Sequence, residues 1–128
     1  MILIILNNYA VGLAIGYVLE FVYRFLKYKK IVKPLFVNSQ MYGLTAAFLY
    51  FIYFLKLGIL FQGLLILVFT TTVEFIVGYS YLKIKGVRLW DYSDQHFNYK
   101  GIICPTFSFY WLMVSLLYFY LVLPIFLS

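Results

Sequence analysis

Acidic residues are scarce in this chain, which has four Asp and Glu against ten Lys and Arg among its 128 residues. Its single cysteine, Cys104, excludes an intrachain disulfide. The sequence contains no Walker A motif, so ATP hydrolysis is not carried by this chain. The chain starts without a basic n-region, and its first apolar stretch is too long for a cleavable signal peptide, so we expect the first span to be retained.

Apolar residues dominate what is present. The chain is 66% hydrophobic and 23% aromatic, with a mean hydropathy of +0.97. This composition is typical of membrane proteins and not of soluble domains. A helix needs about 20 residues to cross a bilayer, and four segments reach that length, near 4–27, 37–56, 58–82 and 103–127. The sequence therefore predicts an all-α polytopic membrane protein whose four transmembrane helices form one domain, residues 1–128.

Basic residues are concentrated in two of the three connections between these spans. Only Lys56 lies at the turn between the second and third spans, whereas the other nine lie at the end of the first span or after the first or third span: Arg24, Lys27, Lys29, Lys30, Lys33, Lys83, Lys85, Arg88 and Lys100. By the positive-inside rule we expect a cell-membrane protein with both basic loops in the cytoplasm and both termini outside. The same charges would rest on anionic lipid headgroups. No soluble module is present that would carry a nucleic-acid site.

Two of the four acidic residues, Glu20 and Glu74, lie inside predicted spans. A charge at the bilayer centre costs about 2.5–3.5 kcal/mol on insertion scales, and such a residue normally faces a bundle interior or a wet cavity and has a partner. Arg24 follows Glu20 by one helical turn and is a candidate partner. We therefore take Glu20, Arg24 and Glu74 as a candidate site for an ion, a proton or a small polar solute. The alternative is a structural clamp, with Arg24 between both glutamates.

The chain also resembles itself. Residues 19–22 match residues 73–76 at an offset of 54, and Lys29 and Lys83 fall in the same register. This match predicts two helical hairpins in a parallel pseudo-repeat, an arrangement whose binding sites lie near the repeat interface. Glu20 precedes Lys27 by seven residues and Glu74 precedes Lys83 by nine. Both carboxyl groups are thus expected about 10–14 Å below the cytoplasmic boundary.

The second basic connection, residues 86–101, is rich in aromatic and turn-forming side chains. Aromatic residues favour the headgroup level, and Asp, Ser and Asn build tight turns. A re-entrant loop that folds back over the bundle is tolerated where protein covers it. We take this loop as a candidate substrate gate, the alternative being a headgroup-level turn, and its candidate residues are Trp90, Asp91, Tyr92, Ser93, Asn98 and Gly101. The spacing of Asp91, Asp94 and His96 fits no metal-ligand signature, so no metal is predicted.

These motifs resemble the CmpB-like family, a group of small polytopic membrane proteins described as ABC-transporter type IV permeases. The resemblance covers nearly the whole chain. Its residues are 73–75, Gly78, 88–93, Asn98, 101–104, 107–108 and Trp111 in the second half, with Glu20, Tyr23, Arg24, Tyr42 and Gly43 in the first. His96 and the short connection before Tyr42 depart from the family pattern. The resemblance implies a bacterial inner-membrane protein with a permease-like role and a separate ATPase subunit as a partner.

Two interpretations of the function follow. The first is a small transporter or channel-like subunit, with Glu20, Arg24 and Glu74 as the binding site and the 86–101 loop as its gate. The second is a non-transport protein, either an assembly or regulatory subunit or a lipid-headgroup-binding protein or enzyme. The enzyme version is disfavoured, because no nucleophile–base pair is recognised, and no cofactor is predicted. Gly12 and Gly16 form a small-xxx-small face that either packs within the chain or joins two copies.

Overall fold

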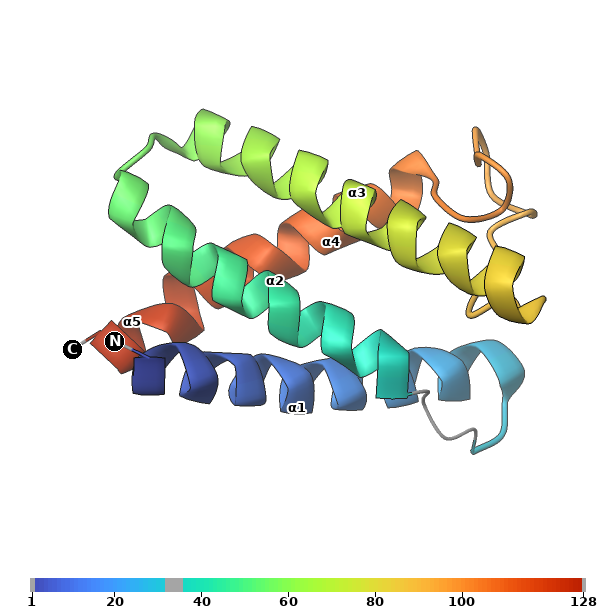
Figure 1. Cartoon of the computed structure of the whole chain (residues 1–128), viewed down its shortest axis with the longest axis horizontal. Coiled ribbons are helices and arrows are strands. Elements are labelled where there is room, and N and C mark those ends of the chain that lie inside the picture. The colour runs from blue at the N-terminus through green and yellow to red at the C-terminus, as the bar shows by residue number, and fades with distance from the viewer. Residues whose placement is uncertain (1, 32–35, 128) are drawn as a thin grey trace. The chain divides into compact units, whose positions relative to one another are not determined.

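The regular elements of the structure are helices. The computed structural model describes residues 2–31 and 36–127, and in these ranges the elements are α1 (Ile2–Tyr28), α2 (Phe36–Leu55), α3 (Ile59–Lys85), α4 (Pro105–Leu117), a π-helical turn (Tyr118–Val122) and α5 (Leu123–Leu127) (Figure 1). The exception is an isolated antiparallel bridge between Tyr99 and Ile103. The predicted all-α class is confirmed, and the helix bounds follow the four predicted spans closely.

In the part of the chain that the structure describes, three helical stretches are long and apolar enough to cross a membrane, namely Ile2–Tyr28, Ile59–Lys85 and Pro105–Ile125. Helix α2, with 20 residues, is a shorter fourth. Its first half carries buried polar side chains, Asn38, Ser39 and Thr45, which lower its hydropathy. The chain is therefore a polytopic membrane protein.

The chain divides into two compact units, which are described separately. The first contains α1, α2 and the end of the chain from Phe119, and the second runs from Lys56 to Tyr118. The expectation of one domain over residues 1–128, and of a repeat relating the two hairpins, stays a prediction.

In the first unit, α1 and α2 run side by side as a helical hairpin (Figure 1). Glycines on α1 allow the close approach. A Cβ atom at Gly16 would overlap the ring of Tyr42, and one at Gly12 would lie 2.9 Å from the Tyr42 carbonyl oxygen. The fully buried Asn8 donates a hydrogen bond to the Ala46 carbonyl at 2.6 Å. The Gly12/Gly16 face is thus used for packing within the chain.

In the second unit, α3 ends at Lys85 and is followed by Gly86, whose φ of 66° is the left-handed conformation common after helix C-termini. The Gly86 N–H donates to the Leu82 carbonyl. A loop then leads to α4, which starts at Pro105, where a missing N–H leaves no helical bond unmade. A hydrogen bond of 2.9 Å joins Thr71 of α3 to Ser108 of α4. This bond links the two helices of the second unit.

The last helical stretch is irregular around Pro124. A proline in a helix cannot donate to the carbonyl four residues earlier, and its ring crowds that carbonyl. The π-helical turn Tyr118–Val122 ends just before this proline, at the place where the regular bonding pattern is interrupted. The structure thus changes helix type just before Pro124.

Candidate functional site

The buried side of α3 is a row of residues spaced four apart. Its members are Gln62, Ile66, Thr70, Glu74 and Gly78, so three of the five are polar. The other sides of the helix carry exposed apolar residues such as Val68 and Ile76, which suit contact with lipid. The helix therefore turns Gln62, Thr70 and Glu74 inward, as expected for a membrane span that lines a polar site.

Glu74 is the ionisable member of this row and is only 2% exposed. Its Oε2 accepts a hydrogen bond of 3.0 Å from the Tyr92 hydroxyl and one of 2.9 Å from the Trp111 indole N–H. Tyr92 belongs to the loop after α3, whereas Trp111 lies on α4. One carboxyl oxygen thus joins three separate segments of the second unit.

Tyr92 is held at Glu74 by its backbone and by its ring. Its N–H donates to the Gly101 carbonyl at 2.8 Å, and its ring stacks on Phe107 with centroids 4.4 Å apart and planes 13° apart. Trp90 fixes the same loop, because its indole N–H donates to the Ile102 carbonyl at 2.7 Å. A Cβ atom at Gly78 would lie 3.0 Å from the Trp90 ring, so this glycine lets the indole pack closely on α3.

The other loop candidates shape the backbone around Tyr92. The Asp91 carboxylate accepts a hydrogen bond from the Ser93 N–H at 3.0 Å, and the Asn98 side chain accepts one from the Gly101 N–H at 2.9 Å. Lys100 and Gly101 have φ values of 56° and 69°, and the Ile102 N–H bonds the Tyr99 carbonyl at 3.0 Å. A turn closed by a hydrogen bond of this kind, with positive φ values at both central residues, is a type I′ turn. The loop is therefore an ordered structure folded back against α3.

The second candidate carboxyl group lies in the first unit. Glu20 and Arg24 form an ion pair of 3.7 Å between Oε2 and Nε, one helical turn apart on α1. The Tyr42 hydroxyl donates to the other oxygen of Glu20 at 3.2 Å. The structure thus joins Glu20 to Arg24 and, separately, Glu74 to the predicted loop. The combination of Glu20, Arg24 and Glu74 in one site spans the two units and stays a prediction.

Sequence reasoning named Tyr92 and Trp111 but did not assign them to Glu74. It took the loop as a gate for the binding site formed by the intramembrane carboxyl groups, and it predicted no direct contact between the two. The sequence did indicate that Glu74 needs partners from another segment. A buried carboxyl group needs hydrogen-bond donors, and α3 has no basic residue one turn after Glu74.

One further group, the thiol of Cys104, lies beside this site just before α4. Burial raises the pKa of the Cys104 thiol, an effect larger than the opposing backbone hydrogen bond from Phe107. Over residues 2–31 and 36–127, no three His, Cys, Asp or Glu side chains gather as a metal site would require. The site thus offers hydroxyl, indole and carboxyl groups for hydrogen bonding and proton exchange.

A family model described as "Putative ABC-transporter type IV" matches residues 7–128. The chain belongs to this family, CmpB. The match includes both candidate glutamates, the ordered loop and Trp111. Comparison with curated proteins and with solved structures found no match.

Proposed function

We propose that this CmpB-family chain is the membrane-embedded subunit of a transport system and that Glu74 binds a proton or a small cationic solute inside the membrane. The proposal is carried by one observation: Glu74 is buried in an apolar span and accepts hydrogen bonds from the loop through Tyr92 and from α4 through Trp111. An ionisable residue inside a membrane span is rarely retained without a role.

Other polar groups of the second unit support this role. Gln62 and Thr70 share the buried side of α3 with Glu74, and Ser115 is buried on α4. The Thr70 hydroxyl donates to the Ile66 carbonyl at 2.8 Å, which satisfies it within the helix. Buried hydroxyl and amide groups in an otherwise apolar helix pair are side chains that can hydrogen-bond to a small polar solute or a hydrated proton.

The loop acts as the gate in this proposal. Because Tyr92 donates directly to Glu74, moving the loop away removes one donor from the carboxyl group and opens a route to it. Trp90, Asp91, Ser93, Asn98 and Gly101 then serve as positioning residues, since their contacts hold the loop backbone on which Tyr92 is carried. Glu20 and Arg24 form a second polar group, which lies in the first unit.

The Glu74→Gln variant distinguishes a proton-binding role of Glu74 from a purely structural one. Both described hydrogen bonds end on one oxygen of Glu74, so an amide oxygen in the same place accepts them while the side chain no longer exchanges a proton. We expect the interior of proteoliposomes that contain the wild-type chain to acidify when a membrane potential is imposed, as measured with a trapped pH-sensitive dye. The Glu74→Gln variant should lose this proton flux.

Glu20→Gln is measured alongside as a comparison, because it removes the other intramembrane carboxyl group, which lies in the first unit. Equal flux from Glu74→Gln and the wild type would overturn the role of Glu74. Failure of Glu74→Gln to accumulate in the membrane would instead assign Glu74 to the structural clamp.

The partner is tested separately. The chain would be isolated from its own membrane in mild detergent, and the mass of the intact complex would be measured by native mass spectrometry. Co-purification of an ATPase at fixed stoichiometry is the expected result for a permease subunit. A homo-oligomer without an ATPase would contradict that assignment, and it would have to form through a surface other than the Gly12/Gly16 face, which packs on α2.

A further inference from the structure

Two lysines share one aromatic ring at the loop end of α3. The ammonium groups of Lys83 and Lys100 lie 5.5 Å and 5.2 Å from the centre of the Tyr79 ring. Lys100 is also 5.6 Å from the centre of the Tyr99 ring. Phe75 stacks on Tyr79 with centroids 5.4 Å apart, and Tyr99 meets Phe75 at 5.7 Å. Three rings thus form a platform, defined as Phe75, Tyr79 and Tyr99, that carries two positive charges.

The backbone holds Lys100 in this position at a cost. Lys100 adopts a φ of 56°, a conformation that side-chain-bearing residues adopt rarely. The Arg88 guanidinium donates to the Lys100 carbonyl at 2.9 Å and so fixes the turn from the other side. Lys83 comes from the last turn of α3, 17 positions earlier in the chain. Both ammonium groups are therefore brought to the Tyr79 ring by the fold and not by sequence proximity.

The charges of this platform are not neutralised by the protein. Within the described parts of the chain, neither Lys83 nor Lys100 forms an ion pair with a carboxylate, and the ion pair that is present joins Glu20 to Arg24. The nearby Asp91 turns its carboxylate to the Ser93 N–H. Two like charges on one platform repel each other, and an anion bound between them removes that cost.

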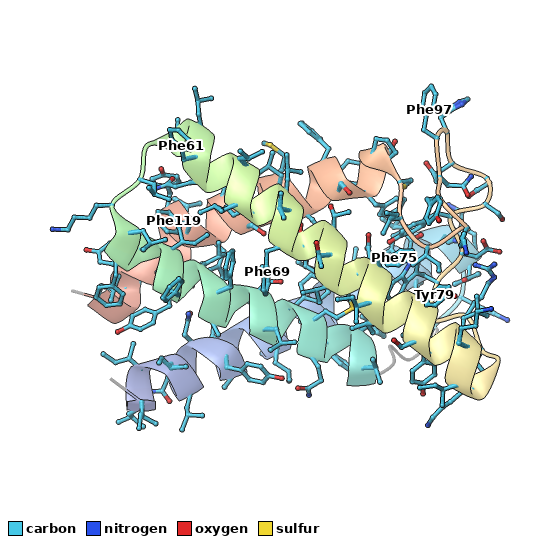
Figure 2. All side chains as sticks on the ribbon, turned by 45° about the horizontal axis from the view of Figure 1, so that its top comes forward. Phe61, Phe69, Phe75, Tyr79, Phe97 and Phe119 are labelled. Carbon is cyan, nitrogen blue, oxygen red and sulfur yellow. The ribbon has the colours of Figure 1, made fainter. Side chains whose placement is uncertain are left out.

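The location points to the nature of the anion. Helix α3 is long and apolar enough to span a membrane, and Lys83 lies in its last turn. The ends of such spans meet the layer of lipid phosphates, which Lys side chains and Tyr rings favour. Figure 2 shows Phe75 and Tyr79 near this end of α3, beside the loop.

We propose that Lys83 and Lys100, on the Phe75–Tyr79–Tyr99 platform, form a binding site for a phosphate group, supplied by an anionic phospholipid headgroup or by a free phosphate. The two ammonium groups contact the phosphate oxygens, and the Tyr79 ring places both ammonium groups. Arg88 is a positioning residue that acts through the Lys100 carbonyl. The site is independent of the transport role proposed for Glu74.

The test uses the whole chain in detergent with measured amounts of added lipid. Native mass spectrometry would count the molecules of phosphatidylglycerol or phosphatidylcholine retained per chain. We expect the wild type to retain phosphatidylglycerol in preference, and Lys83→Gln and Lys100→Gln each to weaken that retention about fivefold.

Lys85→Gln is the matched control, because it removes one charge from the same helix end but its ammonium group lies over a different ring, Tyr81, at 5.2 Å. Its retention should change by at most about twofold. Equal losses from Lys85→Gln and Lys100→Gln, or equal retention of both lipids by the wild type, would overturn the site. Tyr79→Leu, which keeps every charge, should also lose the preference, and its helix content by circular dichroism would show that it is folded.

Added inorganic phosphate distinguishes the two sources. Displacement of the retained lipid by millimolar phosphate would assign the site to the phosphate group alone. Retention of the lipid in the presence of phosphate would assign it to the phospholipid headgroup.

Discussion

The hydroxyl of Tyr92 and the carboxyl group of Glu74 are hydrogen-bonded at 3.0 Å, although one belongs to the loop after α3 and the other to the middle of that helix. The loop therefore reaches back along α3 by more than two helical turns. This contact ties the only acidic residue of α3 to the segment that contains the other two acidic residues of the second unit, Asp91 and Asp94.

Removing the Tyr92 hydroxyl should loosen the loop. Tyr92→Phe keeps the stacked ring on Phe107 but leaves the buried Glu74 oxygen with one donor fewer, which costs about 1–3 kcal/mol. We expect a lower unfolding temperature in detergent and faster trypsin cleavage after Arg88 and Lys100. Tyr99→Phe is the control, because the Tyr99 side chain is largely exposed. Identical behaviour of the two variants would show that the Tyr92 bond does not hold the loop.

Two glycines with the same backbone conformation should respond differently to alanine. Gly86 and Gly101 have φ values of 66° and 69°, so alanine costs about 1–2 kcal/mol of backbone strain at either place. A Cβ atom at Gly86 meets nothing within 4 Å, whereas at Gly101 it would lie 2.9 Å from both Arg88 and Asp91 side-chain atoms. Gly101→Ala should therefore lose more stability and also disturb the hydrogen bond from Arg88 to the Lys100 carbonyl. The unfolding temperatures of both variants measure this difference in stability. Equal decreases for Gly86→Ala and Gly101→Ala would contradict the predicted crowding at Gly101.

Close packing of α1 on α2 should make Gly16 intolerant of a methyl group. Gly16→Ala places the methyl group on the Tyr42 ring, and overpacking of this kind costs about 1–3 kcal/mol. Gly63→Ala, also inside a helix, meets only Leu112 at 3.7 Å, an ordinary contact, and should be neutral or slightly stabilising. Comparison of the two unfolding temperatures tests this, and a stable Gly16→Ala would contradict the observed packing.

The Cys104 thiol should react slowly with alkylating reagents. Its burial raises its pKa above the ordinary value of 9.0, so the thiolate that reacts is disfavoured in the folded chain at neutral pH. Because the folded-state pKa is the higher one, the associated stability is complete below pH 9 and is lost as pH rises through the folded pKa. Maleimide labelling in detergent should be slow at pH 7 and fast after denaturation. Rapid labelling of the folded chain would contradict this prediction.

The sequence predicted the fold class and the helices well, because apolar stretches near 20 residues are a strong and local signal. It placed the third helix near 58–82 and the structure has it at Ile59–Lys85. The contacts of Tyr92 and Trp111 with Glu74 were beyond such reasoning, since they depend on how a loop folds back and not on periodicity. The sequence did not predict the Phe75–Tyr79–Tyr99 platform for the same reason, because Lys100 reaches Tyr79 through a turn with left-handed backbone conformation.

The exposed Phe97 shows the limit of reading side chains by type. The sequence assigned the loop aromatics to the headgroup level as one group, yet their surroundings differ. Tyr92 is 6% exposed, whereas Phe97 is 91% exposed and points away from α3 at the tip of the loop (Figure 2). A left-handed φ of 57° at Phe97 places it there.

The spacing of the buried row on α3 has a geometric consequence. Its residues are four apart, and because a helical turn takes 3.6 residues, the row from Gln62 to Gly78 winds around the helix, inclined by about 26° to its axis. A neighbouring helix parallel to α3 would cover only the middle of the row, around Thr70, and leave both ends turned aside. A change in crossing angle alone therefore alters which polar groups are covered, with no sliding of either helix along its length.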